Sequence, residues 1–273
     1  MSSERLSQPS PENFSEALTY ESFWLIHGEI CGFDEATMRQ IWTEAECQYT
    51  DELPYHNFFH VTETLSIALN LADQRGANDT IVDRRALIVA TLFHDAGYQD
   101  DHKATGFNSK EERSVSIFKF HADKYGMTAD EMATGENAIM ATKPGQKPVS
   151  VEDKILVRAD LDNVTGDFEG FIGKTHLLRN EAKLLGGYKS DVVFTVTSMR
   201  VLAEYISNDL SLGDWETNHW SLQASKNIRR LAVEVAKHQG ESMTHFVQEL
   251  GSVTLNKLLL RDRQEDSDDE AER

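Results

Sequence analysis

One uninterrupted apolar segment, which ends in an adjacent His-Asp pair, constrains the fold more than any other feature of the chain. Residues 86–93 read Ala-Leu-Ile-Val-Ala-Thr-Leu-Phe, and no Gly or Pro occurs within 80–95. Such a run suits a buried strand or a buried helix, but this length exceeds that of an ordinary strand. Gly97 then marks the helix stop. The sequence therefore predicts a buried helix with His94 and Asp95 in its last turn.

A second polar stretch also borders an apolar helical pattern. Residues 55–60 read Tyr-His-Asn-Phe-Phe-His, and the helical pattern runs from there over 58–75. A charge buried in such a setting costs free energy unless it is paired or bound to a metal. Histidine and aspartate are ligands for divalent ions such as Zn²⁺, Mn²⁺ or Fe²⁺. The two stretches together predict a metal site, with hydrogen-bonded core residues as the alternative.

The remainder of the chain reads as further helices. Asp34 is a favourable N-cap, and Thr128 with Glu131 matches a capping box. No stretch predicts a strand, so we expect an all-α fold. The further helices are expected over 13–30, 34–49, 110–125, 128–142, 150–164, 167–185, 190–207, 215–239 and 242–260.

The acidic charge of the chain limits its partners. The net charge is −19 over 273 residues, and the segment 261–273, with seven acids and three arginines, contributes −4 of it. Such a surface repels nucleic acid and anionic membranes, so we expect neither as a partner. We expect a disordered leader at 1–12, a single helical domain over 13–260 and a disordered acidic tail at 261–273.

Cysteine usage and hydropathy indicate a cytoplasmic protein. The two cysteines, Cys31 and Cys47, provide no disulfide framework. The first residues lack an apolar signal region. No segment approaches the ~20 apolar residues of a membrane helix.

The order of the polar motifs resembles a known signature. An isolated His, an adjacent His-Asp pair and a distant Asp form the pattern of the HD metal-dependent phosphohydrolases. The first motif, Tyr-His-Asn-x-x-His, is similar to that of the cyclic nucleotide phosphodiesterases. Together with Phe-His-Asp-Ala-Gly-Tyr and Glu-Glu-Arg-Ser at 111–114, it also resembles the bacterial group called predicted metal-dependent HD phosphohydrolases. The resemblance covers residues 55–205 and implies an HD-domain helical bundle.

This resemblance implies a ligand set. His60, His94, Asp95 and Asp160 match the signature in order, and would hold one or two divalent ions of Mn, Zn, Mg or Fe. In the family, the Asp of the pair can bridge a second ion, which gives Asp95 a catalytic role as well. A divalent ion in such a site activates water and polarises a phosphoryl oxygen.

His56 precedes His60 by four residues and has three possible roles. The phosphodiesterase resemblance implies that it is the general acid that protonates the leaving oxygen. A helical pair at this spacing also suits joint binding of one metal. A structural hydrogen bond at the helix start is the third possibility.

Two arginines resemble substrate-binding positions of the HD phosphohydrolases. They are Arg179, in Leu-Leu-Arg-Asn-Glu, and Arg200, in Ser-Met-Arg-Val-Leu. Guanidinium groups bind phosphate in bidentate geometry. A salt bridge on a helix surface is the alternative for each. The residues Glu111, Glu112 and Ser114 have no assigned role.

The resemblance implies a metal-dependent phosphohydrolase that acts on a small phosphorylated substrate. This substrate is a phosphomonoester or phosphodiester, with a nucleotide as the favoured class. The alternatives are an HD-type iron oxygenase and a non-catalytic sensor that binds metal or nucleotide. Extra His ligands are frequent before the last Asp in dinuclear members, but Lys143-Pro144 occupies this place here, which counts against the oxygenase. The sequence leaves the oligomeric state open.

Overall fold

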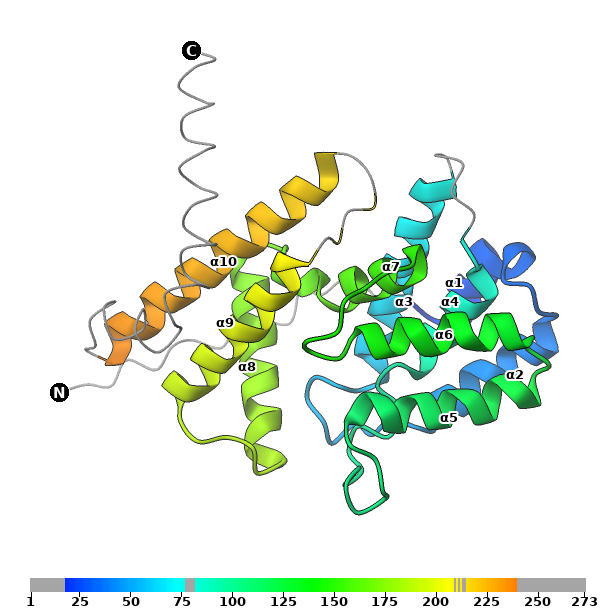
Figure 1. Ribbon diagram of the computed structural model, residues 1–273, viewed down its shortest axis with the longest axis horizontal. Coiled ribbons are helices and arrows are strands. Elements are labelled where there is room, and N and C mark those ends of the chain that lie inside the picture. The colour runs from blue at the N-terminus through cyan, green and yellow to red at the C-terminus, as the bar shows by residue number, and fades with distance from the viewer. Residues whose placement is uncertain (1–17, 77–81, 209, 211, 213–214, 240–273) are drawn as a thin grey trace, which may run out of the picture.

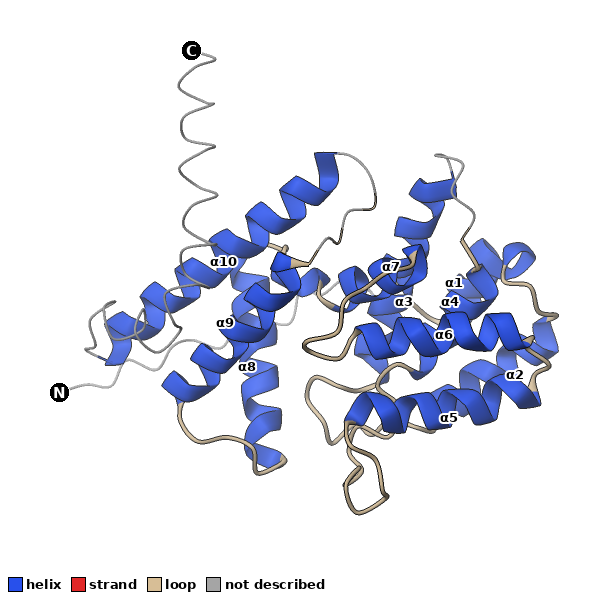
Figure 2. Ribbon diagram, in the orientation of Figure 1, coloured by secondary structure: helices blue, strands red, loops and turns tan. Residues whose placement is uncertain are grey.

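Helices form the whole regular structure of the described chain. The computed structural model describes residues 18–76, 82–208, 210, 212 and 215–239. No strand occurs in these residues (Figure 2), so the prediction of an all-α fold is confirmed. The helices are α1 (Tyr20–His27), α2 (Glu35–Glu46), α3 (Phe58–Gly76), α4 (Arg84–Phe93), α5 (Lys110–Lys124), α6 (Ala129–Ala141), α7 (Val151–Asp160), α8 (Phe168–Leu184), α9 (Asp191–Ser207) and α10 (Trp215–Gln239), with short 3₁₀ turns η2 (Gly28–Ile30) and η3 (Asp162–Val164).

The predicted helix starts follow from side chains that cap the first turn. Asp34 accepts a hydrogen bond from the Thr37 backbone N–H at 2.9 Å, and Thr128 forms a capping box with Glu131. These contacts satisfy backbone donors that a helix leaves unpaired. The first helix, predicted over 13–30, begins at Tyr20 after the Thr19 cap and tightens into η2 after His27, while 13–17 lie outside the described residues. The leader at 1–12, the helix at 242–260 and the tail at 261–273 lie outside the described residues.

The apolar run forms a buried helix, as predicted, but the helix ends earlier than expected. All eight residues 86–93 are buried, and α4 stops at Phe93. His94 is the C-cap and Asp95 follows in the turn. The prediction that both lie in the last helical turn was therefore wrong, because the helix ends directly before them. The chain bends because Gly97 takes a φ of 71°, which residues with a Cβ rarely adopt.

Two hydrophobic clusters meet at α7. The larger cluster combines α1 to α6 with Ile155, Leu156 and Ala159 of α7. The smaller cluster takes Val157 from α7 and packs it against residues of α8, α9 and α10. In Figure 1, α7 lies between these two groups of helices. Its last residue, Asp160, therefore lies where the clusters join. A single domain over 13–260 stays a prediction. No helix among the described residues is long and apolar enough to cross a bilayer.

The packing of α5 on α6 yields a test of the fold. A Cβ placed at Gly135 would lie 2.3 Å from Phe118 Cζ, whereas one at Gly173 on α8 would meet nothing within 4 Å. We expect Gly135→Ala to lower the free energy of unfolding by about 1–3 kcal/mol through overpacking. Gly173→Ala should raise it by about 0.5–1 kcal/mol, as usual for a helix interior. Urea denaturation measures both, and equal effects would contradict this packing.

Candidate metal centre

The structure brings together the four residues that the sequence proposed as metal ligands. His60 lies in the first turn of α3, His94 and Asp95 follow α4, and Asp160 ends α7. One ligand atom from each lies within 4.8 Å of the other three. His60 Nε2 is 3.1 Å from Asp160 Oδ1 and 3.7 Å from Asp95 Oδ2. His94 Nε2 is 3.2 Å from Asp95 Oδ2 and 3.6 Å from Asp160 Oδ1.

Two buried atoms of this cluster lack hydrogen bonds. Among the described residues, neither His94 Nε2 nor Asp95 Oδ2 has a hydrogen-bond partner, although both are shielded from solvent. A buried polar atom in this condition costs roughly 1–3 kcal/mol. His94 Nδ1 donates to the Thr91 carbonyl at 2.7 Å, so Nε2 is the ring atom left to bind a cation, which would displace its proton. The donor set and its unsatisfied atoms therefore fit a divalent metal ion.

The electrostatics of the cluster keep both carboxylates ionised. Burial alone would raise the pKa of Asp95, but the imidazoles of His94 and His56 outweigh burial and lower the pKa to about 2. Burial is likewise outweighed at Asp160, where His60 and His94 hold the pKa far below its usual range. Ionised carboxylates at neutral pH are the state that binds a cation.

His56 lies beside the cluster and is held by a buried carboxylate. Its Nε2 is 3.9 Å from Asp95 Oδ2, and its Nδ1 forms a short hydrogen bond with Glu181 Oε1. Glu181, on α8, is 2% exposed and also accepts from the backbone N–H groups of Tyr55 and His56 at 3.1 and 2.9 Å. Burial would raise the pKa of Glu181, but these contacts lower it, so the carboxylate only accepts. Nδ1 of His56 therefore carries a proton, and Nε2 faces the cluster.

A stack of side chains covers the other side of this imidazole. The Tyr98 ring lies 3.7 Å from the His56 ring with an interplanar angle of 16°. Lys110 Nζ lies 3.0 Å from the centroid of the Tyr98 ring. Burial lowers the pKa of Lys110 to about 8, against the opposing effect of Asp95 and Glu181. Through Tyr98, the segment between α4 and α5 thus shields His56.

The structure does not bring the two arginines to the cluster. Arg179 Nη1 lies 3.0 Å from Asp191 Oδ1, and both side chains are partly exposed. Arg179 is two residues from Glu181, so the two side chains leave α8 on different faces. Arg200 is an exposed residue of α9. Substrate binding by these arginines stays a prediction.

The Glu-Glu-Arg-Ser segment supports the ligands from outside. Ser114 Oγ donates to the Ala96 carbonyl at 3.1 Å, which ties α5 to the turn that carries the His-Asp pair. Glu112 accepts from the backbone N–H of Asn108 and pairs with Lys143. The second contact fixes the start of α5 to the turn after α6.

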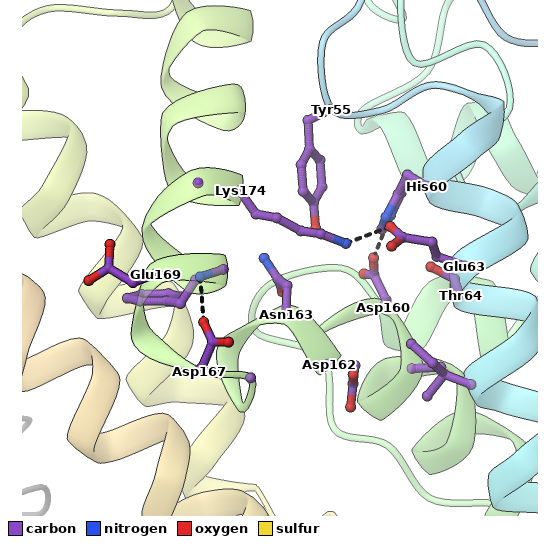
Figure 3. Close-up of a pocket in the computed structure, with 16 residues that line it drawn as sticks. Tyr55, His60, Glu63, Thr64, Asp160, Asp162, Asn163, Asp167, Glu169 and Lys174 are labelled. Carbon is purple, nitrogen blue, oxygen red and sulfur yellow. Dashed lines mark hydrogen bonds and ion pairs between the residues drawn. The ribbon is translucent and has the colours of Figure 1, made fainter. Parts of the chain in front are cut away.

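A cavity of about 380 Å³ adjoins the metal ligands. His60 and Asp160 belong to its wall, and α3, η3 and α8 supply most of the rest (Figure 3). Sequence analysis missed this cavity and missed Glu181. Neither has a local signal, because the sequence pattern of α8 does not single out Glu181, and the walls come from three separate segments.

Comparisons with known proteins give a fold and no family. No protein-family model matches the chain, and no curated protein matches it. A solved structure, described as LmjPDEB1 in complex with IBMX, superposes with a TM-score of 0.57 at 15% identity. The match covers 80% of this chain and 85% of that chain. This chain therefore shares the all-helical fold of that structure.

The geometry of the cluster yields a test of metal binding. We expect Asp95→Ala to lower both the metal content and the thermal midpoint, because the ion would lose a ligand shared between α4 and its neighbours. Elemental analysis and thermal unfolding measure these effects. Asp123→Ala, an exposed carboxylate on α5, is the matched control and should change neither. Unchanged metal stoichiometry in Asp95→Ala would refute the assignment.

Proposed function

We propose that this protein is a metal-dependent phosphohydrolase that cleaves a phosphomonoester or phosphodiester, of which nucleotides are one class. The observation that carries this proposal is the cluster of His60, His94, Asp95 and Asp160, with two buried ligand atoms that lack hydrogen-bond partners. The adjoining cavity and the likeness in fold to a phosphodiesterase support it.

The four clustered residues would hold one or two divalent ions of Mn, Zn, Mg or Fe. An ion held there supplies an activated water near neutral pH and positive charge for the phosphoryl oxygens. The chain contributes the arrangement of ligands. Asp95 and Asp160 are held ionised by their histidine neighbours, and the Thr91 carbonyl orients the His94 ring.

The role proposed for His56 is to give a proton to the leaving oxygen. Its Nδ1–H is held by Glu181, so Nε2 is the atom that faces the reacting centre. Tyr98 packs on the ring and prevents it from turning away. An imidazole fixed in this way transfers a proton with little reorganisation. Glu181 acts as a positioning residue, since it contacts His56 and the backbone rather than the cluster.

Phosphate binding by Arg179 or Arg200 remains part of the proposal. In the structure, Asp191 accepts from Arg179 and also from the Tyr188 hydroxyl. Arg179 would therefore have to leave Asp191 to reach a phosphate.

The neighbouring histidines are expected to fail in different ways. His60→Ala should release metal and abolish turnover together. His56→Ala should keep its metal but lose roughly 10²–10⁴-fold in kcat, the usual contribution of a general acid. The loss should be smaller on a nitrophenyl ester than on an alkyl ester, because nitrophenolate leaves readily without a proton. Metal content and kcat on both esters measure this.

Two results would contradict these roles. Loss of metal from His56→Ala would make His56 a ligand. An equal rate deficit on both esters would rule out proton donation. If the metal-loaded wild-type protein hydrolyses no phosphoester, the iron oxygenase and the sensor become the leading functions.

The carboxylate behind His56 is open to a separate test. Glu181→Gln keeps the shape of the side chain but removes its charge. We expect it to keep metal and to lower kcat about tenfold on the alkyl ester, with a smaller loss on the nitrophenyl ester. A purely structural role would lower both rates by the same factor, so the ratio of the two rates is the decisive measurement. Asp123→Asn, an exposed carboxylate on α5, is the control.

A further inference from the structure

The cavity beside Asp160 carries a strong excess of negative charge. Lys174 is the one Lys or Arg among the described residues of its wall, and its Nζ forms an ion pair with Glu63 Oε2 at 2.5 Å (Figure 3). Its charge is thus already matched. The carboxylates of the wall are Glu63, Asp160, Asp162, Asp167 and Glu169.

Three polar side chains of the wall can accept a hydrogen bond from a ligand. Thr64 contributes a buried hydroxyl. Asn163 lies between Lys174 and Asp160 in Figure 3, and the structure gives its side-chain amide no partner among the described residues. Asp162 has no ion pair within 4 Å in the described chain, and its one side-chain contact is the Thr165 hydroxyl at 3.5 Å. A carboxylate without an ion pair in an acidic wall favours a ligand that brings positive charge.

The cavity also has room for a ligand. A Cβ placed at Gly173, on the α8 wall, would meet no atom within 4 Å. The volume of about 380 Å³ is within the range of small-molecule sites. The wall is continuous with the metal ligands through Asp160, so an ester whose phosphate lies at the cluster extends its alcohol part into this space.

We infer that this cavity binds the alcohol part of the substrate, and that this alcohol carries a protonated amine with Asp162 as its counter-ion. The inference rests on the proposed function and narrows it to amino-alcohol phosphates. The ammonium group supplies charge and N–H donors, which Asp162, the Asn163 carbonyl and the Thr64 hydroxyl accept. A second phosphate or a carboxylate in the same place is repelled by the wall.

The test compares three esters that share their phosphate. They are 2-aminoethyl, 2-hydroxyethyl and carboxymethyl phosphate, assayed with the metal-loaded full chain. We expect kcat/KM to fall in this order, with roughly tenfold between the first two, a factor typical of one partly exposed ion pair. Asp162→Asn should remove the preference for the amine while hydrolysis of the hydroxyethyl ester continues. Asp123→Asn, an exposed acid on α5, should keep the preference.

A second variant tests the cavity without changing charge. Gly173→Leu fills the open space, and we expect it to raise KM about tenfold for the aminoethyl and hydroxyethyl esters at unchanged metal content. Unchanged KM values would show that the alcohol lies elsewhere and would overturn the inference. This variant also serves if Asp162→Asn fails to fold.

Failure of the inference is distinguishable from failure of the proposed function. Hydrolysis of all three esters without a preference for the amine overturns the inference and leaves the phosphohydrolase intact. A preference for a nucleoside monophosphate, whose alcohol part carries no ammonium group, does the same. If none of the esters is hydrolysed, the proposed function fails. Calorimetric Kd values for the same esters then decide the inference: tightest binding of the aminoethyl ester supports it, and equal Kd values overturn it.

Discussion

The burial of two carboxylates against two imidazoles is the constraint on which the rest of the structure depends. His60, His94, Asp95 and Asp160 come from three helix ends, and their ligand atoms lie within 4.8 Å of one another. Such a cluster is unfavourable in a core unless its charges are matched and its lone pairs are used. A divalent cation does both. Because the ligands join α3, α4 and α7, metal binding would stabilise the packing of these helices as well as the site.

The second half of the chain completes the site rather than merely covering it. α7 belongs to both hydrophobic clusters and carries Asp160 to their junction. Glu181, on α8, accepts hydrogen bonds from the backbone N–H groups of Tyr55 and His56. The same helix forms a wall of the cavity. The metal ligands thus lie at the edge of the larger helical group, while the orientation of His56 and the substrate space depend on α8.

The part of the site that could be predicted from sequence is the part whose signals are local. His94 and Asp95 follow an apolar run whose length favours a buried helix over a strand, and His60 lies in the first turn of another helix. Their place at helix ends follows from periodicity and from Gly97. The end of α4 was predicted too late in the chain, after Asp95 instead of at Phe93. The turn that follows depends on the left-handed backbone at Gly97 and on the hydrogen bond from Ser114 to the Ala96 carbonyl. The helix caps at Asp34 and Thr128 could also be predicted, because their signals lie within a few residues of the helix start.

The remainder depends on tertiary contacts that no local pattern encodes. Glu181 is 125 residues from His56, and its helix reads as an ordinary amphipathic segment. Arg179 has the residue type that phosphate binding needs, but its partner in the structure is Asp191, on the next helix. The acidic cavity arises where three segments approach one another. Net charge predicted repulsion of nucleic acid but gave no location for the carboxylates that would select a substrate.

Every role proposed for the site depends on a divalent ion bound by the His-Asp cluster. Calorimetric titration of Mn²⁺ or Zn²⁺ into the chelated protein, followed by thermal unfolding, measures this binding. We expect saturable binding of one or two ions per chain. We also expect a higher unfolding midpoint, since an ion at about 100 times its Kd stabilises the folded state by roughly 2.7 kcal/mol. The absence of saturable binding, with the same midpoint in metal and in chelator, would contradict metal binding by the cluster.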